Sequence, residues 1–219
     1  MSGVVRAFAA ARDLKADYPD FRLVVGTRLV FSDGTPDVVA HPVDREAYGR
    51  LCALLTLGNR RAPKGECHLE LADLLRSAEG LLLIAMVDHQ AFEAGMMAVQ
   101  AIRAAAPGQV WVGATYRFNG NDRARLAKLA AACSAVGVPM LATMDALYHQ
   151  RDRHILQDVL TCIREGITFE AVGYSLAANG ERFIRPAREV ARLFADYPDA
   201  VAQSQVILDR IHFSLDELK

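Results

Sequence analysis

Apolar positions recur at two different periods along the first third of this chain. Val4, Val5, Phe8 and Ala11 follow a helical spacing, so the first dozen residues are predicted to form a helix. The apolar run at residues 22 to 31 has instead the β-rich character of a strand. A helix followed by strands is therefore expected at the start of the fold.

A β-hairpin is predicted around the sequence Ser32, Asp33, Gly34. This turn lies between the run at residues 22 to 31 and a second apolar run, DVVAHPV. Asp-Gly between two β-rich runs is a strong signal for a tight turn. The two runs are expected to pair as antiparallel strands.

Asp44 is placed to cap the next helix, and Gly58 is placed to end it. The apolar positions of this helix share one face: Tyr48, Leu51, Cys52 and Leu55. A shorter helix is predicted at residues 68 to 75. The apolar run at residues 81 to 87 is short and uniformly hydrophobic, which is typical of a buried strand.

From residue 90 onward, helical and strand-like segments alternate regularly. The pattern predicts helices at 90 to 105 and 122 to 136, and strands at 109 to 118 and 138 to 145. This alternation indicates an α/β fold with a parallel sheet. One further helix, which contains Ile155 and Ile163, is predicted to end near Gly166. Two more helices are predicted near residues 187 to 196 and 199 to 211.

Composition and charge narrow the class of protein. The chain has 219 residues, of which 52% are hydrophobic and 23% charged, which suits one globular domain. The 25 basic and 26 acidic residues nearly cancel, so the chain lacks the basic footprint of an autonomous nucleic-acid binder. Any contact with DNA is expected to be local or to be made by a neighbouring domain.

The cysteines and the N-terminal residues favour the reducing cytoplasm. Cys52, Cys67, Cys133 and Cys162 are widely spaced and form no CxxC pair, so neither a zinc ribbon nor a disulfide framework is predicted. The N-terminal apolar stretch is short and interrupted by arginines, which excludes a signal peptide or membrane span there. No membrane partner is expected.

Several long segments of the chain resemble one protein family in their order and content. The segments are GVVRAFAAARD, RLVVGTRLVF, LCALLTLGNRRAPKGECHLELADLL, EGLLLIAM, LATMDALYHQRDRHILQDVLTCIREG and FSLDEL. Together they resemble the PHP (polymerase and histidinol phosphatase) domain of bacterial error-prone C-family DNA polymerases. The most specific pieces are the loop GNRRAPKGECHL and the block YHQRDRHILQDVLTCIREG.

The resemblance implies a PHP-type distorted (βα)7 barrel at the front of a larger polymerase. In the family, a strand, helix and strand that carry the first metal motifs precede GVVRA, so residues 1–219 are expected to form a partial PHP domain with an incomplete barrel. A helical extension at about residues 186–219 is expected to lead toward the polymerase body. The catalytic aspartates of nucleotide transfer belong to that body, so no polymerase residues are expected in this chain.

Two metal-ligand positions of the family are occupied here by residues that cannot bind a metal. Metal-competent relatives carry Gly-x-Glu at the strand that matches GTRL, and Arg28 stands at the glutamate position. They carry Asp-x-His at the later motif, where this chain has Asp145 followed by Leu147. A cation in place of a carboxylate opposes metal binding and is able to fill the vacated charge position.

Asp145, His149 and His154 are the residual metal-ligand candidates, because the loop after a barrel strand folds over the barrel mouth. Few partners remain to complete a shell for Zn, Mn or Mg, so no cofactor is expected. The commoner role of an aspartate such as Asp145 is to cap a turn or to pair with an arginine. The commoner role of the two histidines is a solvated position near a helix start.

Asp88 and His89 are second-rank candidates, because they follow a predicted strand. Glu66, Cys67 and His68 are adjacent ligand types, but neighbouring residues of an extended loop point in different directions. A structural loop is the favoured interpretation of those three residues.

Two further groups of residues have side chains of the kinds that bind nucleic acids. Arg60, Arg61 and Lys64 form a small basic loop, which is expected to contact a phosphate or a polymerase partner. Its commoner role is a solvated surface. A second group, the aromatic residues Trp111, Tyr116 and Phe118, lies on both faces of one predicted strand, so core packing is favoured over base stacking.

Three functions compete at this stage. The favoured one is a non-catalytic structural or interaction module of an error-prone polymerase, with a decayed metal site and with the polymerase body as its partner. The alternative is a stand-alone PHP-type phosphoesterase or pyrophosphatase. An unrelated barrel enzyme using Asp88, Asp145 and His149 is the third. An incomplete barrel exposes strand edges, so self-association, strand exchange or a rearranged N-terminal helix is also expected.

Overall fold

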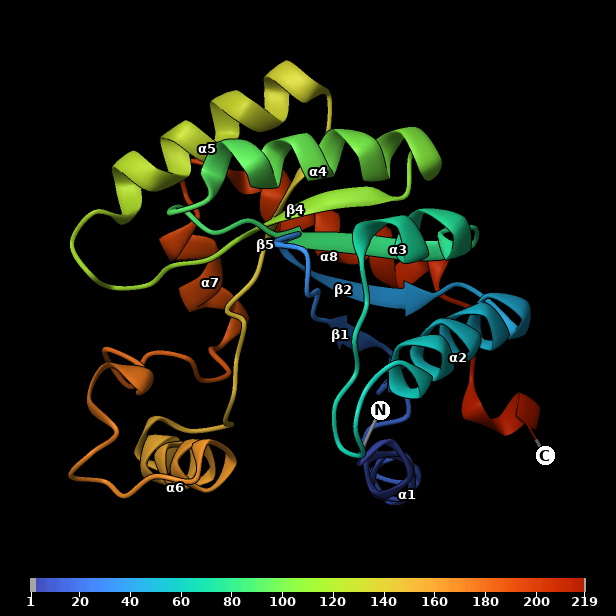
Figure 1. Cartoon of the computed structure of the whole chain (residues 1–219), viewed down its shortest axis with the longest axis horizontal. Helices are drawn as coiled ribbons and strands as arrows, with labels where there is room; N and C mark the ends of the chain where they lie inside the picture. Colours follow the sequence, from blue (N-terminus) through green and yellow to red (C-terminus); the bar gives the residue numbers. More distant parts are fainter. Residues whose placement is uncertain (1–2, 219) are drawn as a thin grey trace.

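The computed structural model describes residues 3–218, which form helices around a mixed sheet of five strands (Figure 1). The strands lie in the sheet in chain order. They are β1 (Thr27–Leu29), β2 (Asp37–Pro42), β3 (Leu81–Met86), β4 (Val110–Ala114) and β5 (Met140–Ala142). The first three strands pair antiparallel, whereas β3, β4 and β5 pair parallel.

The predicted β-hairpin is confirmed, but its strands are shorter than the apolar runs. Thr27 pairs with Ala40 and Leu29 pairs with Val38. Beyond β1 the backbone turns toward another part of the chain, because the Ser32 N–H donates to the Leu69 carbonyl at 2.9 Å. This bond ties the start of the hairpin turn to the segment before α3 (Leu71–Ser77).

The helices lie close to their predicted positions. They are α1 (Val4–Leu14), α2 (Arg45–Arg60), α3 (Leu71–Ser77), α4 (Phe92–Ala105), α5 (Asp122–Val136), α6 (His154–Glu165), α7 (Ala187–Leu193) and α8 (Pro198–Arg210). Short 3₁₀ turns occur at Arg151–Arg153, Gly173–Ser175 and Leu215–Leu218. The alternation of helices and strands after residue 80 is thus confirmed.

The ends of α2 show one correct and one wrong prediction. Asp44 caps the helix as expected, since its Oδ1 accepts the Ala47 N–H at 2.8 Å. Gly58 does not end α2, which continues to Arg60. A β carbon at Gly58 would lie 2.6 Å from Cys67 Sγ and 2.9 Å from the Leu69 side chain, so this glycine permits close packing.

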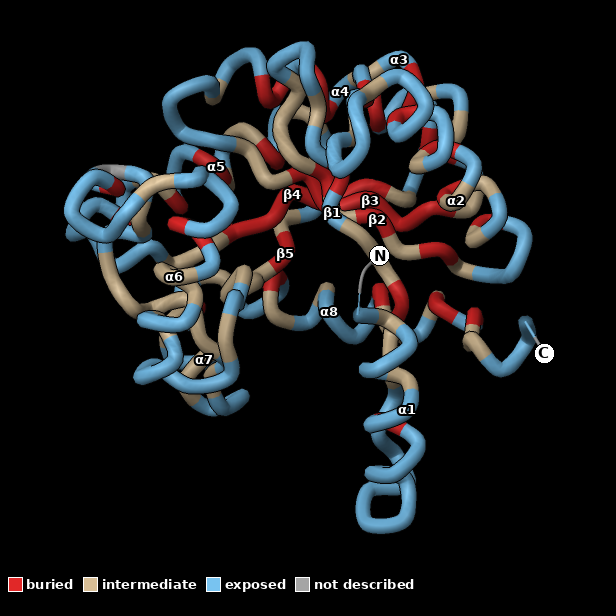
Figure 2. Tube along the Cα trace, turned by 60° about the horizontal axis from the view of Figure 1, so that its bottom comes forward, coloured by how far each residue is buried: buried red, intermediate tan, exposed pale blue. Residues whose placement is uncertain are grey.

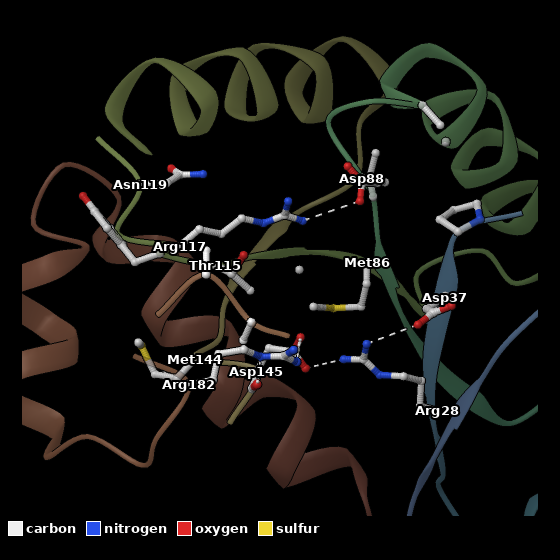
Figure 3. A pocket seen from close by; sticks show the side chains of 18 of the residues that line it. Arg28, Asp37, Met86, Asp88, Thr115, Arg117, Asn119, Met144, Asp145 and Arg182 are labelled. Atoms are coloured by element: carbon white, nitrogen blue, oxygen red, sulfur yellow. Dashed lines mark hydrogen bonds and ion pairs between the residues drawn. The ribbon is translucent and has the colours of Figure 1, made fainter. Parts of the chain in front are cut away.

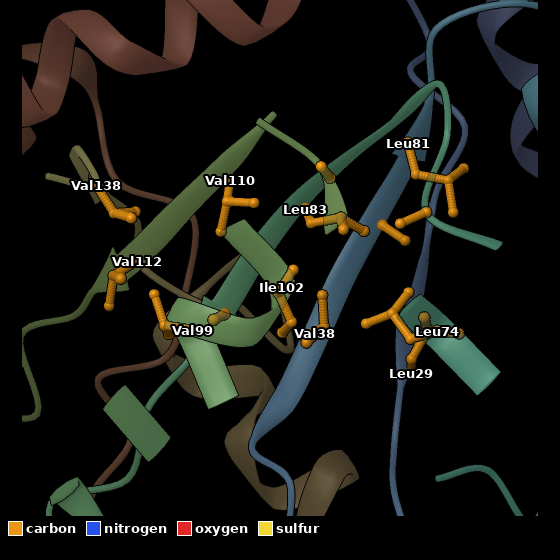
Figure 4. Close-up of a cluster of buried hydrophobic side chains, with 14 of the residues drawn as sticks. Leu29, Val38, Leu74, Leu81, Leu83, Val99, Ile102, Val110, Val112 and Val138 are labelled. Atoms are coloured by element: carbon orange, nitrogen blue, oxygen red, sulfur yellow. The ribbon is translucent and has the colours of Figure 1, made fainter. Parts of the chain in front are cut away.

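The sheet is buried on both faces, and β3 shows this most clearly. Leu81, Leu83 and Ala85 face the larger apolar core beneath α2 to α5, whereas Leu82 and Ile84 face the opposite side. Figure 4 shows the larger core, in which side chains of the strands meet those of the helices. The uniform hydrophobicity of this strand therefore follows from two covered faces.

The second face of the sheet is covered by α8. Trp111 is buried there beside Ile207 and Ile211, and its Nε1–H donates to Gln203 Oε1 at 2.7 Å. This placement confirms core packing for Trp111. Residues 186–219, expected as a helical extension, include α7 and this α8, which packs on the sheet.

The observed sheet confirms the α/β class but not the barrel. Over residues 3–218 the sheet is open, with β1 and β5 as its edges. Parallel pairing, predicted from the later alternation of helices and strands, holds for β3, β4 and β5, and the antiparallel pairing predicted for the hairpin holds for β1 and β2. The hairpin turn reverses the chain direction, and β2 then pairs with β3 in the antiparallel sense.

Two helices lie apart from the layers around the sheet. Figure 2 shows α1 extending away from the sheet, and Figure 1 shows α6 beside the long segment that follows β5. A parallel β-bridge between Tyr148 and Phe183 joins the part of that segment before α6 to the part after it. None of the helices among residues 3–218 combines the length and apolar character needed to cross a membrane.

Two glycine substitutions in α2 test the close packing at Gly58. Gly58→Ala is expected to lower the free energy of unfolding by about 1 to 3 kcal/mol, because the new methyl overpacks the contact with Cys67 and Leu69. Gly49→Ala is the matched control, since no atom lies within 4 Å of its β-carbon position. This control is expected to raise the free energy of unfolding by about 0.5 to 1 kcal/mol. Urea unfolding measures both, and equal effects would contradict the packing argument.

Candidate functional site

A cavity of about 610 Å³ lies at the carboxyl ends of the parallel strands β3, β4 and β5. Met86 and Asp88 reach it from β3, Thr115 and Arg117 from β4, and Asp145 from β5 (Figure 3). The carboxyl ends of parallel strands are where α/β folds usually bind ligands. This cavity is therefore the candidate site.

The lining is rich in charged groups from distant parts of the chain. The β-hairpin contributes one wall, and the segment after α6 contributes another. The charged lining residues are Arg28, Asp37, Asp88, Arg117, Asp145, Glu181 and Arg182. Positive and negative side chains are thus mixed around one cavity.

Asp145 lies between two arginines. Arg28 Nη2 donates to Asp145 Oδ1, and Arg182 Nη2 donates to Asp145 Oδ2 at 2.5 Å. Arg182 Nε also donates to the Asp145 carbonyl at 3.0 Å. Both carboxylate oxygens therefore accept charge-assisted hydrogen bonds, the stronger kind in proteins.

The same contacts connect three regions of the chain. Arg28 in β1 also donates to Asp37 in β2 at 3.2 Å, so it joins the hairpin to the end of β5. Arg182 brings in the segment that follows α6. Asp145 has a φ of 45°, a left-handed conformation that is uncommon outside glycine, and its N–H donates to Thr143 Oγ1. Residues held in this conformation often lie at functional positions.

Asp88 lies across the cavity from this group. Its Oδ1 accepts the Gln90 N–H at 3.0 Å, which holds the pKa of Asp88 below its ordinary value, although burial opposes the shift. Arg117 Nη2 lies 4.0 Å from Asp88 Oδ2 and lowers the pKa further. Asp88 is therefore a carboxylate near neutral pH. His89 is not part of the cavity wall.

Asp122 fixes the loop that presents Arg117. Its two carboxylate oxygens accept the N–H groups of Arg117 and Phe118, each at 2.8 Å. Burial acts to raise the pKa of Asp122, but these bonds and Arg125 outweigh burial and leave the pKa lowered. Phe118 has a φ of 55°, so the anchoring offsets an unfavourable backbone conformation.

The two histidines predicted beside Asp145 lie outside the cavity. His149 lines a separate hollow of about 210 Å³ together with Leu147 and residues of α6. The His154 Nδ1 lies 3.0 Å from the Arg151 carbonyl, at the start of α6. The structure thus brings Asp145 together with Arg28 and Asp88, and does not bring it together with either histidine.

The donor set of the cavity does not fit a metal centre. Among residues 3–218, no three histidine, cysteine, aspartate or glutamate side chains come together as a potential metal site. A metal at Asp145 would have to displace the guanidinium groups that already contact both of its oxygens. Two arginines already supply positive charge at this carboxylate.

The basic loop is only partly free to contact a partner. Arg61 Nη1 lies 2.5 Å from Asp73 Oδ2, and Arg76 contacts the other oxygen of this buried carboxylate at 2.6 Å. Arg60 and Lys64 are exposed and line no cavity described above. A phosphate or partner contact by this loop therefore depends on those two side chains.

The adjacent ligand types Glu66, Cys67 and His68 do not converge on one point. Cys67 packs inward near Gly58. His68 Nε2 lies 3.0 Å from Glu66 Oε2 on the exposed side of the loop. The geometry agrees with a structural loop.

The aromatic residues that follow β4 differ in burial. Tyr116 packs edge-on against Phe194 with ring centroids 5.2 Å apart, while Phe118 is more exposed to solvent.

Sequence reasoning missed four charged residues of the cavity: Asp37, Arg117, Glu181 and Arg182. Arg117 lies near the carboxyl end of the strand predicted at residues 109 to 118, and this position was a usable signal. Arg182 comes 37 positions after the aspartate that it binds, and no local pattern marks it. Asp37 begins the second strand of the hairpin, and no candidate site residue was predicted on that strand.

No family model matches the chain, but curated proteins resemble it along its whole length. It is 48% identical over 221 residues to an error-prone DNA polymerase of Rhodopseudomonas palustris strain BisB5. It is 46% identical over 220 residues to one of Brucella abortus and 43% identical over 221 residues to one of Sinorhizobium medicae. In each case the whole chain is covered, and it spans about a fifth of the relative's length. The chain is therefore similar to one part of these polymerases.

Replacing Arg28 tests the ion-pair cluster. Arg28→Met keeps the length of the side chain but removes the contacts with Asp37 and Asp145, and is expected to lower the free energy of unfolding by about 1 kcal/mol. This loss of stability is expected to be smaller at high salt, because salt screens the ion pairs that Arg28 forms in the parent protein.

Arg123→Met is the control for Arg28→Met, because Arg123 forms an exposed pair with Asp196 at 3.6 Å. Its effect is expected to stay within about 0.5 kcal/mol. Urea unfolding at low and high salt gives both values. An Arg28→Met protein as stable as the Arg123→Met control would show that the cluster contributes nothing.

Proposed function

We propose that this chain is the PHP-domain part of an error-prone DNA polymerase and acts as a structural or interaction module without a working metal site. The observation that carries the proposal is the pairing of both Asp145 oxygens with Arg28 and Arg182. The similarity of the whole chain to part of several error-prone DNA polymerases supports the polymerase context.

The proposed loss of metal chemistry follows from the charge at the cavity. Metal-dependent phosphoester hydrolysis needs cations about 3.5 to 4 Å apart, held by several carboxylates and histidines. By family resemblance Arg28 and Leu147 stand at two ligand positions, and Arg28 contacts the remaining aspartate directly. The guanidinium group supplies the positive charge that a metal would otherwise bring to Asp145.

The proposed structural role follows from what the arginines connect. Through Asp145 they hold together the hairpin, the end of β5 and the segment that follows α6. A rigid frame is what a support for a larger polymerase requires. The open sheet corresponds, in this proposal, to part of the PHP barrel, and residues 186–219 to the approach toward the polymerase body.

A stand-alone PHP phosphoesterase is the second candidate, and one observation favours it. Asp88 is ionised and faces the same cavity at the carboxyl end of the sheet, where an enzyme of this kind would bind a phosphate. Arg117 Nη2 lies 4.0 Å from Asp88 Oδ2, and His89 Nδ1 lies 3.8 Å from Asp88 Oδ1. Asp88 alone does not make a shell for two metals, so this candidate ranks second.

Metal analysis separates the two candidates. The purified chain, incubated with excess Mn²⁺ or Zn²⁺ and desalted, is expected to retain no stoichiometric metal and to leave a generic phosphate ester unhydrolysed. The physical reason is that Asp145 is held by two arginines. Two or more bound ions together with hydrolysis, both lost in Asp145→Ala, would make the phosphoesterase the correct function.

A chimeric polymerase tests the polymerase context. The matching fifth of the Rhodopseudomonas palustris BisB5 polymerase is replaced by this chain, which is 48% identical to it. Primer extension by the chimera is expected to fall by no more than about tenfold, equivalent to about 1.4 kcal/mol, because a module contributes packing rather than catalytic groups.

The control for the chimera is the same polymerase with the matching fifth deleted. This deletion variant is expected to give little soluble protein and little primer extension. A chimera as inactive as this deletion would contradict the proposed polymerase role. The metal result does not affect this outcome, so the two parts of the proposal are tested independently.

A further inference from the structure

Helix α6 carries its apolar side chains on the side that faces solvent. Ile155, Leu156, Leu160 and Ile163 are all more than half exposed, and Ile163 reaches 70%. Their spacing along the helix places them on one face. On the opposite face Thr161 is buried and His154 is half-buried. The helix is therefore amphipathic with its apolar face outward.

This orientation is the reverse of that in an ordinary surface helix, which buries its apolar stripe. The exposed patch also extends beyond the helix. Leu147 is 43% exposed, and together with Leu156 and Leu160 it borders the hollow that contains His149. A continuous apolar surface with a depression is a feature of protein contact sites.

The patch is held in a fixed position relative to the cavity. The Leu147 N–H donates to the Arg182 carbonyl at 2.8 Å, and the Ile184 N–H donates to the Tyr148 carbonyl at 3.2 Å. Arg151, at the start of α6, forms an ion pair with Glu181. The same segment provides Arg182 to Asp145. An ordered apolar surface is suited to docking against a rigid partner.

Charge argues against a membrane as the occupant of this surface. Residues 151 to 165 contain three arginines, Arg151, Arg153 and Arg164. They also contain three acidic residues, Asp152, Asp158 and Glu165. Helices that lie on membranes have a basic excess on their polar face, which is lacking here.

Size argues against a second copy of the chain. A helix of 12 residues is about 18 Å long and about 10 Å wide, so its face offers an area on the order of 200 Å². A stable interface between separate proteins needs about 800 Å² from each partner. A partner on the same polypeptide needs far less, because the connection raises its effective concentration to about the millimolar range.

We infer that the apolar face of α6, with Leu147, docks onto an apolar surface of the remainder of the same polymerase chain. This inference rests on the proposed function. The relatives are about five times longer than the part that matches this chain, so ample polypeptide exists to cover the patch. The contact buries the four exposed apolar side chains of α6 and fills the hollow beside His149.

Cysteine labelling of two matched positions tests the inference. Ile155→Cys lies in the patch at a position 59% exposed, and Met97→Cys lies on α4 at a position 71% exposed. Each substitution is placed in this chain and in the chimeric polymerase. The rate of labelling at the new cysteine is obtained by subtracting the labelling of the same protein without the substitution. At position 155 the rate is expected to be at least about tenfold slower in the chimera than in the chain, while the rate at 97 changes less than about twofold.

A second measurement uses polar substitutions in the patch. Leu160→Ser combined with Ile163→Ser is expected to lower the unfolding midpoint of the isolated chain only slightly, because both side chains are at least half exposed there and serine is a somewhat weaker helix former. In the chimera the same pair is expected to shorten the half-life at the inactivation temperature by at least about threefold.

The outcomes distinguish this inference from the function on which it rests. Equal labelling of position 155 in the chain and in an active chimera would overturn the docking but not the polymerase role. A chimera that does not extend primers would overturn both. Slower labelling of position 155 as the isolated chain is concentrated, with dimers in sedimentation, would make a second copy the occupant and overturn the inference.

Discussion

The arrangement of the candidate site depends on one carboxylate held by two guanidinium groups. Asp145 lies at the carboxyl end of the sheet, and its partners come from β1 and from the segment after α6. A lone carboxylate in a cavity would repel Asp37 and Asp88 and would need a cation. Arg28 and Arg182 provide that positive charge from within the chain.

Much of the fold was predictable because its signals are local. The uniform run of β3, the Asp-Gly turn and the Asp44 cap each depend on residues close in sequence. The errors arose where contacts between residues distant in sequence determine the local structure. The Ser32 N–H, just beyond β1, donates to the distant Leu69 carbonyl, and Gly58 is set by its approach to Cys67 and not by a helix end. The α/β pattern also did not reveal whether the sheet closes into a barrel.

The site was less predictable than the fold, for the same physical reason. The sequence pointed to Asp145, Arg28 and Asp88, which follow or lie within predicted strands and do meet at one cavity. It also pointed to His149 and His154, which follow Asp145 closely in sequence yet turn away from it. The loop that carries them is fixed by pairing between Tyr148 and Phe183, a contact between distant residues that no local pattern reveals.

The proposed loss of metal ligands and the proposed docking surface involve the same stretch of chain. Asp145 and Leu147 are two residues apart, yet the first is drawn into the cavity by arginines while the second points into the exposed patch beside α6. A histidine ligand at position 147 would have to face the cavity, so it would compete with this outward placement. With Asp145 paired to Arg28 and Arg182, position 147 carries no ligand role in the proposed function, and the leucine there adds apolar area beside the exposed face of α6. The proposed loss of the metal site and the proposed docking surface therefore agree with each other at this one position.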